Sequence, residues 1–297
     1  MARAPFAPTA PMRAVAGTLS LYRYGIGDPT TGLSPGQFAR ATLTPDGPGT
    51  LHLDWRDGTL RAEAWGPGAD WLLDGVPAIT GALDSGHRFE DAHPSILQAQ
   101  RHHPDVRFGA SRTPYHELLP VVLAQRITGG EAVSQWRRLV QRLGEPAPGP
   151  LGLRLPPLPE RLAGQPAWSL HPLGIEAKRA DALRVVARHA AHLTRWSDAP
   201  GFGEQLRRLP GIGVWTVGSV LAVSHGDPDA VAVGDFHLKN LVAHALTGRA
   251  RGSDEEMLEL LEPYRGQRGR VVRLLQLDGH RPPAFGPRQR VLPMNRW

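Results

Sequence analysis

The chain has 297 residues, of which 41% are hydrophobic, enough to bury the cores of two or three compact units. It carries 34 Lys+Arg against 28 Asp+Glu, for a formal net charge of +6, and all but two of these cations are arginines. Arginine suits phosphate, but genomic base composition also produces such an excess, so the charge alone identifies no partner. Cysteine is absent, which excludes disulfides, thiol catalysis and cysteine-bound zinc or iron–sulfur clusters.

The first 13 residues are rich in proline and alanine, and we expect them to be disordered. They contain no continuous apolar stretch of the kind found in a secretory signal. No run in the chain approaches the ~18 apolar residues that a membrane span needs. We therefore expect a cytoplasmic, nucleoid-associated protein.

Residues 14–108 show the signals of an antiparallel sheet. The segment 50–55 (TLHLDW) alternates apolar and polar residues, 56–58 (RDG) forms a turn, and 59–65 (TLRAEAW) alternates again. This pattern is typical of a β-hairpin. The segment 35–49 and the Gly/Asp-rich stretches after the hairpin predict further strands with one or two covering helices.

From Thr113 onward the apolar period becomes that of helices, with Pro114 at a favourable first helical position. Helices are predicted at 114–123, 131–143, 177–196, 202–208, 214–226, 236–247, 253–264 and 269–277. The predicted fold class is therefore α+β. Its parts are a β-rich N-terminal domain at 14–108, a helical domain at 109–280 and a basic, Pro-rich tail at 281–297.

The segment LPGIGVWT, residues 209–216, joins two of these helices and places two glycines around an isoleucine. Glycine tolerates positive φ and lets another backbone approach closely. The amides at the start of the second helix favour an anion such as phosphate. An ordinary helix–helix turn uses the same residues, so the hairpin alone does not decide between the two interpretations.

Asp235 stands twenty residues beyond Trp215, just before a predicted helix. One interpretation is a helix N-cap, which needs no function. The other interpretation is chemical. Cleavage of an N-glycosidic bond creates an oxocarbenium-like sugar, and one carboxylate can either stabilise that charge or activate the water that attacks the sugar. An alkylated, positively charged base leaves without a strong acid. The hairpin and the carboxylate together favour the chemical interpretation.

The stretch LPGIGVWTVGS followed by VGDFHLKN resembles the helix-hairpin-helix DNA glycosylase superfamily. Upstream, LLPVVLAQRIT and LGIEAKRADALRVVA follow the order of the bacterial 3-methyladenine DNA glycosylase II branch, and the resemblance covers roughly residues 93–277. It implies an N-terminal antiparallel β-rich domain followed by an all-helical helix-hairpin-helix glycosylase domain. It also implies a monomer whose partner is double-stranded DNA containing damaged bases.

The resemblance carries functional residues over position by position. It implies that Asp235 is the catalytic carboxylate and that the amides of Gly211 and Gly213 bind a DNA phosphate. Further DNA contacts are implied at Thr216, Arg126 and Lys239.

The same resemblance implies a base pocket and a cation site. Substrate-binding positions fall at Trp215, Gln125, Ser219, Phe236 and Gln276, with Gln125 in the segment that wedges into DNA. The backbone carbonyls of Arg207, Leu209 and Ile212 would hold a monovalent cation, Na⁺ or K⁺. No other cofactor is required, and no iron–sulfur cluster is expected.

Several positions depart from the family pattern. Trp215 stands where bifunctional relatives carry the lysine that forms a Schiff base, which implies a monofunctional enzyme. Arg126 occupies the usually apolar wedge position, and Ser219 and Gln276 replace pocket aromatics. We expect excision of bases of the 3-methyladenine and 7-methylguanine type. The alternative is a helix-hairpin-helix protein that binds lesions without excising them.

Overall fold

The computed structural model describes residues 2–5, 12–196 and 201–283. The remaining residues expected to be disordered at the N-terminus, and the tail from residue 284 onward, lie outside this part. The described chain combines one antiparallel sheet with many helices, which confirms the predicted α+β class. No helix in the described ranges is long and apolar enough to cross a membrane.

The sheet has five antiparallel strands in the order β1-β5-β4-β3-β2. Their bounds are β1 Ala2–Pro5, β2 Thr31–Ser34, β3 Gln37–Thr44, β4 Gly47–Asp54 and β5 Arg61–Trp65. The predicted hairpin is confirmed as β4 and β5, with Leu53 opposite Ala62. Alternation predicted it correctly because one face of each strand is buried.

The expected N-terminal disorder is wrong for residues 2–5, which form β1 along β5. Without β1, the outer side of β5 would be an unpaired sheet edge, and such an edge readily accepts another strand. Four residues that end in proline give no alternation signal, so the sequence does not predict this pairing.

Three helices complete the packing of the sheet: α1 Met12–Leu19, α2 Ala69–Asp74 and α3 Val76–Ile79. The shared core joins Val15 and Leu19 of α1, Phe38, Leu51 and Leu53 of the strands, Leu72 of α2 and Ile79 of α3. A short 3-10 helix, η1 Ser20–Tyr22, follows α1.

A second core belongs to the central helices. They are α5 Pro114–Leu123, α6 Gly129–Leu143, α7 Pro159–Ala163, α8 Ala167–Leu170, η2 His171–Leu173, α9 Ala177–Arg188, α10 Ala190–Trp196, α11 Phe202–Arg207 and α12 Val214–Ser224. The helix predicted over 177–196 is divided at His189, whose N–H is shared between the carbonyls of Val185 and Val186. The ring Nδ1 of His189 also lies 2.9 Å from the Val185 oxygen, which competes with the regular backbone ladder.

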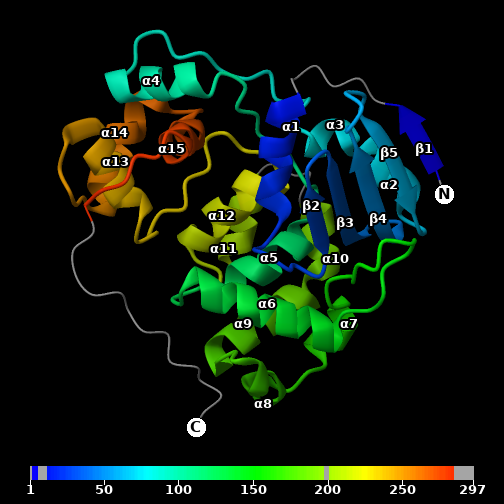
Figure 1. The fold of residues 1–297 in the computed structure, drawn as a ribbon. Coiled ribbons are helices and arrows are strands. Elements are labelled where there is room, and N and C mark those ends of the chain that lie inside the picture. The colour runs from blue at the N-terminus through cyan, green and yellow to red at the C-terminus, as the bar shows by residue number, and fades with distance from the viewer. Residues whose placement is uncertain (1, 6–11, 197–200, 284–297) are drawn as a thin grey trace.

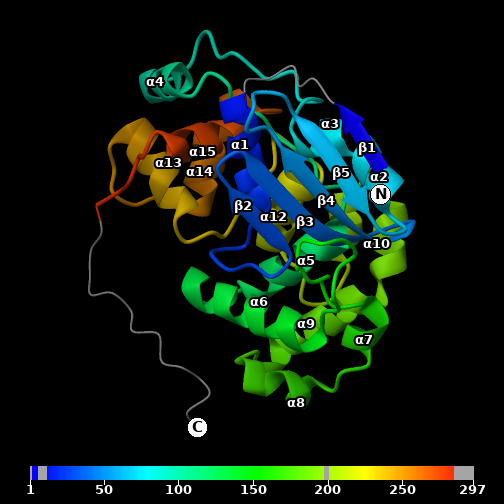
Figure 2. The same ribbon diagram turned by 45° about the vertical axis from the view of Figure 1, so that its right-hand side comes forward.

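A third core joins distant parts of the chain. Helix α4, Pro94–His102, packs with α13 Leu238–Thr247, α14 Asp254–Leu261, η3 Glu262–Tyr264 and α15 Arg268–Leu277. Figures 1 and 2 both show α4 beside these C-terminal helices and away from the sheet. The chain therefore runs from the sheet to this third unit, through the central helices, and back.

A buried polar network fixes the sheet to the central helices. Arg40 of β3 donates to Glu117 of α5 at 2.5 Å, and both side chains are buried. Trp136 of α6 donates its indole N–H to Asp28 at 3.0 Å. Burial raises the pKa of Glu117, while the charge of Arg40 opposes that effect. This network holds α5, which carries Gln125 just beyond its C-terminal end, against the sheet.

Candidate active site

The hairpin between α11 and α12 has two different glycines. Gly211 has φ +85°, and a Cβ at this position would lie 2.8 Å from Cβ of Ala182 in α9. Both its backbone conformation and its packing therefore require glycine. Gly213 has an extended backbone as the N-cap of α12, and a Cβ there would meet no atom within 4 Å. Gly213 leaves open space at the helix terminus.

The hairpin amides are free to bind an anion. Gly211 and Gly213 are exposed, and in the described part of the chain neither N–H donates a hydrogen bond. They adjoin the N-terminus of α12, the positive end of its helix dipole. The geometry suits a phosphate oxygen approaching from solvent.

Gln125 holds the hairpin from the C-terminal end of α5. Its Nε2 donates to the carbonyl of Gly211 at 2.9 Å and to the hydroxyl of Thr216 at 3.0 Å. Thr216 is only 1% exposed, so its hydroxyl serves this internal contact. The next residue, Arg126, is exposed and has φ +60°. A non-glycine residue in this conformation costs about 1–3 kcal/mol, which the surrounding structure must offset.

Asp235 lies in the loop between α12 and α13, and three N–H groups surround its carboxylate. Oδ1 accepts from the amides of His237 at 2.7 Å and Leu238 at 3.0 Å. Oδ2 accepts from the indole Nε1 of Trp215 at 3.2 Å. These donors complement the negative charge of the carboxylate. The N-cap interpretation and the positioned-carboxylate interpretation therefore describe the same side chain.

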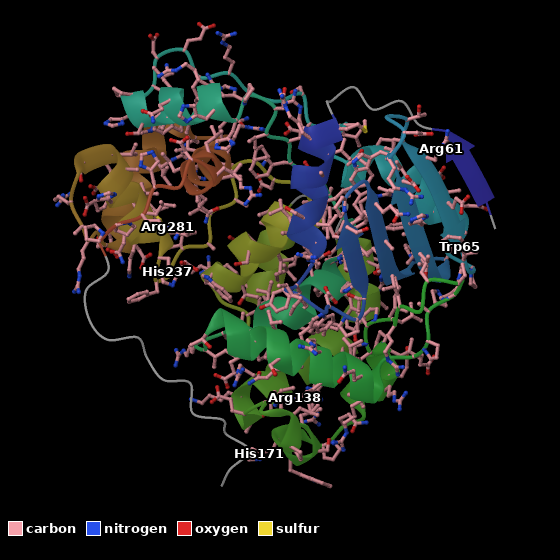
Figure 3. The ribbon with its side chains drawn as sticks, viewed as in Figure 1. Arg61, Trp65, Arg138, His171, His237 and Arg281 are labelled. Carbon is pink, nitrogen blue, oxygen red and sulfur yellow. The ribbon has the colours of Figure 1, made fainter. Side chains whose placement is uncertain are left out.

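Two aromatic residues flank the carboxylate. Trp215, in the first turn of α12, is partly buried and links the hairpin helix to Asp235. Phe236 is 73% exposed, and its ring meets the ring of His237 edge to face at 5.2 Å. Figure 3 shows His237 on the side of the molecule opposite the strands that carry Arg61 and Trp65. The hairpin helix, the carboxylate and an exposed aromatic side chain thus come together away from the sheet.

The loop that carries Asp235 is tied to α14. Gly234, with φ +93°, donates its N–H to Oδ1 of Asp254 at 3.0 Å. Lys239 forms an ion pair with Oδ2 of the same carboxylate at 3.2 Å. Sequence reasoning missed this anchoring role of Asp254. The only available signal is the glycine directly before Asp235, which indicates a special backbone conformation there.

Two other positions are less closely joined to this site. Ser219 donates its hydroxyl to the carbonyl of Trp215 at 2.8 Å, within α12. Gln276 is exposed on α15, and its side chain makes no hydrogen bond with the described residues. No hydrogen bond connects either side chain to Asp235 within the part of the chain that the structure describes.

Solved structures share the fold over most of this chain. The 3-methyladenine DNA glycosylase of Archaeoglobus fulgidus has a TM-score of 0.74 and 17% identity, covering 94% of this chain and 98% of that one. The structure named MBOgg1, in complex with a low-affinity DNA ligand, has a TM-score of 0.66 and 15% identity, with 93% and 97% covered. The 8-oxoguanine glycosylase/lyase of Clostridium acetobutylicum, in its apo form, has a TM-score of 0.61 and 11% identity, with 83% and 87% covered.

The chain has the helix-hairpin-helix DNA glycosylase fold. No family profile and no curated protein sequence matches it. In this chain, the glycine hairpin is the segment between α11 and α12, and Asp235 lies in the loop that follows α12.

The helix-hairpin-helix fold implies a monovalent cation at the hairpin carbonyls, and the residues present fit one. The carbonyls of Arg207 and Ile212 accept no hydrogen bond from any described residue. The carbonyl of Leu209 accepts one, from the amide of Ile212 at 3.1 Å, and keeps a second lone pair. A cluster of three His, Asp or Glu side chains suited to a metal ion is absent from the described residues.

Proposed function

We propose that the protein is a monofunctional DNA glycosylase of base excision repair, of the 3-methyladenine DNA glycosylase II type. It flips an alkylated base out of duplex DNA and hydrolyses the N-glycosidic bond, which leaves an abasic site. The observation that carries this proposal is the carboxylate of Asp235, held by the amides of His237 and Leu238 at the start of α13 and by the indole of Trp215. That indole places the carboxylate beside the helix that the hairpin begins.

DNA binding in this proposal begins at the hairpin. The free amides of Gly211 and Gly213 hold one backbone phosphate, and Arg126 is exposed at the neighbouring α5–α6 connection. Holding the backbone fixes the register of the duplex, which lets a damaged nucleotide leave the stack. The exposed ring of Phe236 then offers a surface on which the flipped base can stack.

Chemistry follows from the charge that develops on the sugar. When the bond from C1′ to the base nitrogen breaks, its electron pair leaves with the base and C1′ becomes oxocarbenium-like. The Asp235 carboxylate stabilises that positive charge and accepts a proton from the water that adds to C1′. A cationic alkylated base departs as a neutral molecule, so no acid has to protonate it.

The side chain at position 215 supports a monofunctional reaction. Trp215 occupies the position of the Schiff-base lysine, and an indole cannot form an imine. Lys239, the lysine nearest to Asp235 in the sequence, is paired with Asp254. We therefore assign hydrolysis alone, without strand cleavage.

A monovalent cation would complete the hairpin site. The carbonyls of Arg207, Leu209 and Ile212 would hold it, and when bound it adds positive charge on the side of the hairpin that meets the phosphate. The protein's own contribution is the conformation of Gly211, which Gln125 fixes through its carbonyl.

The proposal is tested by incubating the full chain with methylated duplex DNA and measuring abasic sites through alkali-labile breaks. Abasic sites should form on methylated DNA and not on unmethylated DNA. A helix-hairpin-helix protein that only binds lesions would retain methylated duplex in a gel-shift assay without forming abasic sites. That outcome would replace the proposed enzyme with a binding protein.

A further inference from the structure

A cavity of about 490 Å³ lies between α1, α4, α15 and the connection 103–107. These elements meet in the upper half of Figure 1. None of the residues that line the cavity belongs to the candidate active site. Cavities of this size hold small organic molecules in other proteins.

Positive charge dominates the lining of this cavity. Its lining contains one carboxylate, Asp105, and four arginines: Arg13, Arg101, Arg107 and Arg273. Asp105 is already paired with Arg13. His102 and His103 also line the cavity, and both face Asp278, a carboxylate outside the lining. The negative charges nearby are therefore already engaged.

Arg273 of α15 has no ion-pair or hydrogen-bond partner among the described residues. It is only partly accessible to solvent, and this desolvation lowers its pKa from the usual arginine value. The guanidinium fork of arginine binds phosphate or carboxylate through two parallel hydrogen bonds. A partly buried, unpaired guanidinium that borders a cavity indicates an anionic ligand.

The remaining walls are apolar. Leu21, Val106 and Leu277 line the cavity together with Ala14 of α1. These side chains would cover the body of a ligand whose charged group meets Arg273. Arg101 also borders the cavity and makes no ion pair within the described residues, so a second cation is available to the same charged group.

We propose that this cavity binds a small molecule that carries an oxyanion, phosphate or carboxylate, on an apolar body, with Arg273 as the group that holds the oxyanion. The site joins α1 of the sheet unit to α4 and α15 of the third unit. A ligand that binds only the folded protein stabilises it, so occupancy should raise the melting temperature.

Binding is measured by calorimetry on the full chain with four probes: phenyl phosphate, benzoate, inorganic phosphate and phenol. Phenyl phosphate or benzoate should bind at least tenfold more tightly than inorganic phosphate, because the ring is buried against the apolar walls. The comparison of phenyl phosphate with benzoate tells which oxyanion the site prefers. Phenol, which lacks the charge, should not bind. Failure of both charged aromatic probes to bind would overturn the proposal.

Two variants test independently whether the probe binds in this cavity. Arg273→Gln should weaken the better probe at least tenfold, whereas Arg265→Gln, an exposed arginine paired with Glu262, should not change its affinity. Gly17→Leu keeps every charge but fills the cavity, since a Cβ at Gly17 meets no atom within 4 Å. It should abolish probe binding without lowering the melting temperature of the free protein.

Unchanged probe affinity in both Arg273→Gln and Gly17→Leu would place the probe elsewhere and overturn the proposal. A different outcome would be that Arg273→Gln weakens duplex DNA binding while no small probe binds the native protein. Arg273 would then be a contact to the DNA backbone, and the cavity would not be a ligand site. The proposal does not depend on the glycosylase activity, since each measurement uses binding or stability alone.

Discussion

The indole Nε1 of Trp215 lies 3.2 Å from Oδ2 of Asp235 and connects the first turn of α12 to the loop before α13. The other carboxylate oxygen is held by the backbone amides of His237 and Leu238, which every substitution except proline leaves in place. Trp215 is therefore the one side chain that hydrogen-bonds to this carboxylate within the described residues. Its ring orients Asp235 relative to the hairpin.

Trp215→Phe should keep an aromatic ring but remove the hydrogen bond to Asp235. A hydrogen bond to a charged group is worth about 1.5–3 kcal/mol, so single-turnover excision should slow by roughly tenfold to a hundredfold. Duplex affinity should stay within about threefold. Trp168→Phe is the matched control, because Trp168 is 77% exposed on α8. Excision by Trp215→Phe at the rate of the control would show that the indole does not position the carboxylate.

Asp235→Asn should abolish base release, because the change removes the charge but keeps the size of the side chain. The Asn oxygen can still accept from the amides of His237 and Leu238, so the start of α13 should persist. Duplex affinity should stay within a few-fold of the native value. The measurement is abasic-site formation beside a binding titration, with Asp181→Asn as the control for loss of an exposed carboxylate on α9. Undiminished excision would sink the catalytic assignment.

The sequence predicts the local structure of this protein better than the contacts between elements that are far apart in the chain. Alternation predicted β4 and β5, and the LPGIG segment predicted the turn between α11 and α12. The sequence singles out Trp215 and Asp235, twenty residues apart. Helix periodicity does not predict the direction of a side chain's N–H, so the hydrogen bond between them could not be predicted. The link from Gln125 to the Gly211 carbonyl spans 86 residues and depends on how α5 packs against α12.

The position of α4 illustrates the same limit. Its apolar residues Ile96 and Ala99 are compatible with many partner surfaces, and it follows directly after the sheet unit in the sequence. In the structure these residues pack against helices near the other end of the chain. Periodicity gives a buried face but not its partner, because non-local pairing is decided by the complementarity of whole surfaces.

The two hairpin glycines should respond differently to substitution. Gly211→Ala should lower the free energy of unfolding by about 1–3 kcal/mol, because its φ is positive and the new Cβ meets Ala182. Gly213→Leu should leave stability nearly unchanged, because the site is open. It should instead weaken binding to damaged and undamaged duplex alike and reduce the salt dependence of binding. Normal duplex affinity in Gly213→Leu, measured by fluorescence anisotropy, would mean that the segment is only a turn.

Buried His116 should make stability depend on pH. Burial, assisted by the charge of Arg40, lowers its pKa well below the ordinary histidine value of 6.5, and its Nδ1 lies 2.9 Å from the Thr42 hydroxyl. The folded state therefore keeps His116 neutral, while the unfolded chain takes up a proton below about pH 6.5. The stability that it contributes is present above that pH and is lost as pH falls, by up to about 1.4 kcal/mol per pH unit.

Urea unfolding between about pH 7.5 and pH 5 would measure this effect in the native protein and in His116→Gln. The quantity to compare is the change in the free energy of unfolding with pH in each of the two proteins. The raised pKa of the neighbouring Glu117 acts in the opposite direction, since its contribution to stability is lost as pH rises. Parallel pH profiles for the two proteins would show that His116 does not carry the dependence.

The substrate range should follow leaving-group chemistry. The groups that contact Asp235 are two backbone amides and an indole, none of which can give up a proton to a departing base. Cationic 3-methyladenine and 7-methylguanine need no such proton, whereas hypoxanthine and ethenoadenine are neutral. With one exposed aromatic beside the carboxylate, stacking contributes roughly 1–3 kcal/mol per base, and it acts on charged and neutral bases alike. Single-turnover excision from matched duplexes should therefore be at least about a hundredfold faster for the cationic bases, equivalent to about 2.7 kcal/mol in the barrier.

If hypoxanthine left as fast as 3-methyladenine, a proton donor would have to act on it. His237, which follows the carboxylate by two residues and whose ring meets Phe236, would be the side chain to substitute next.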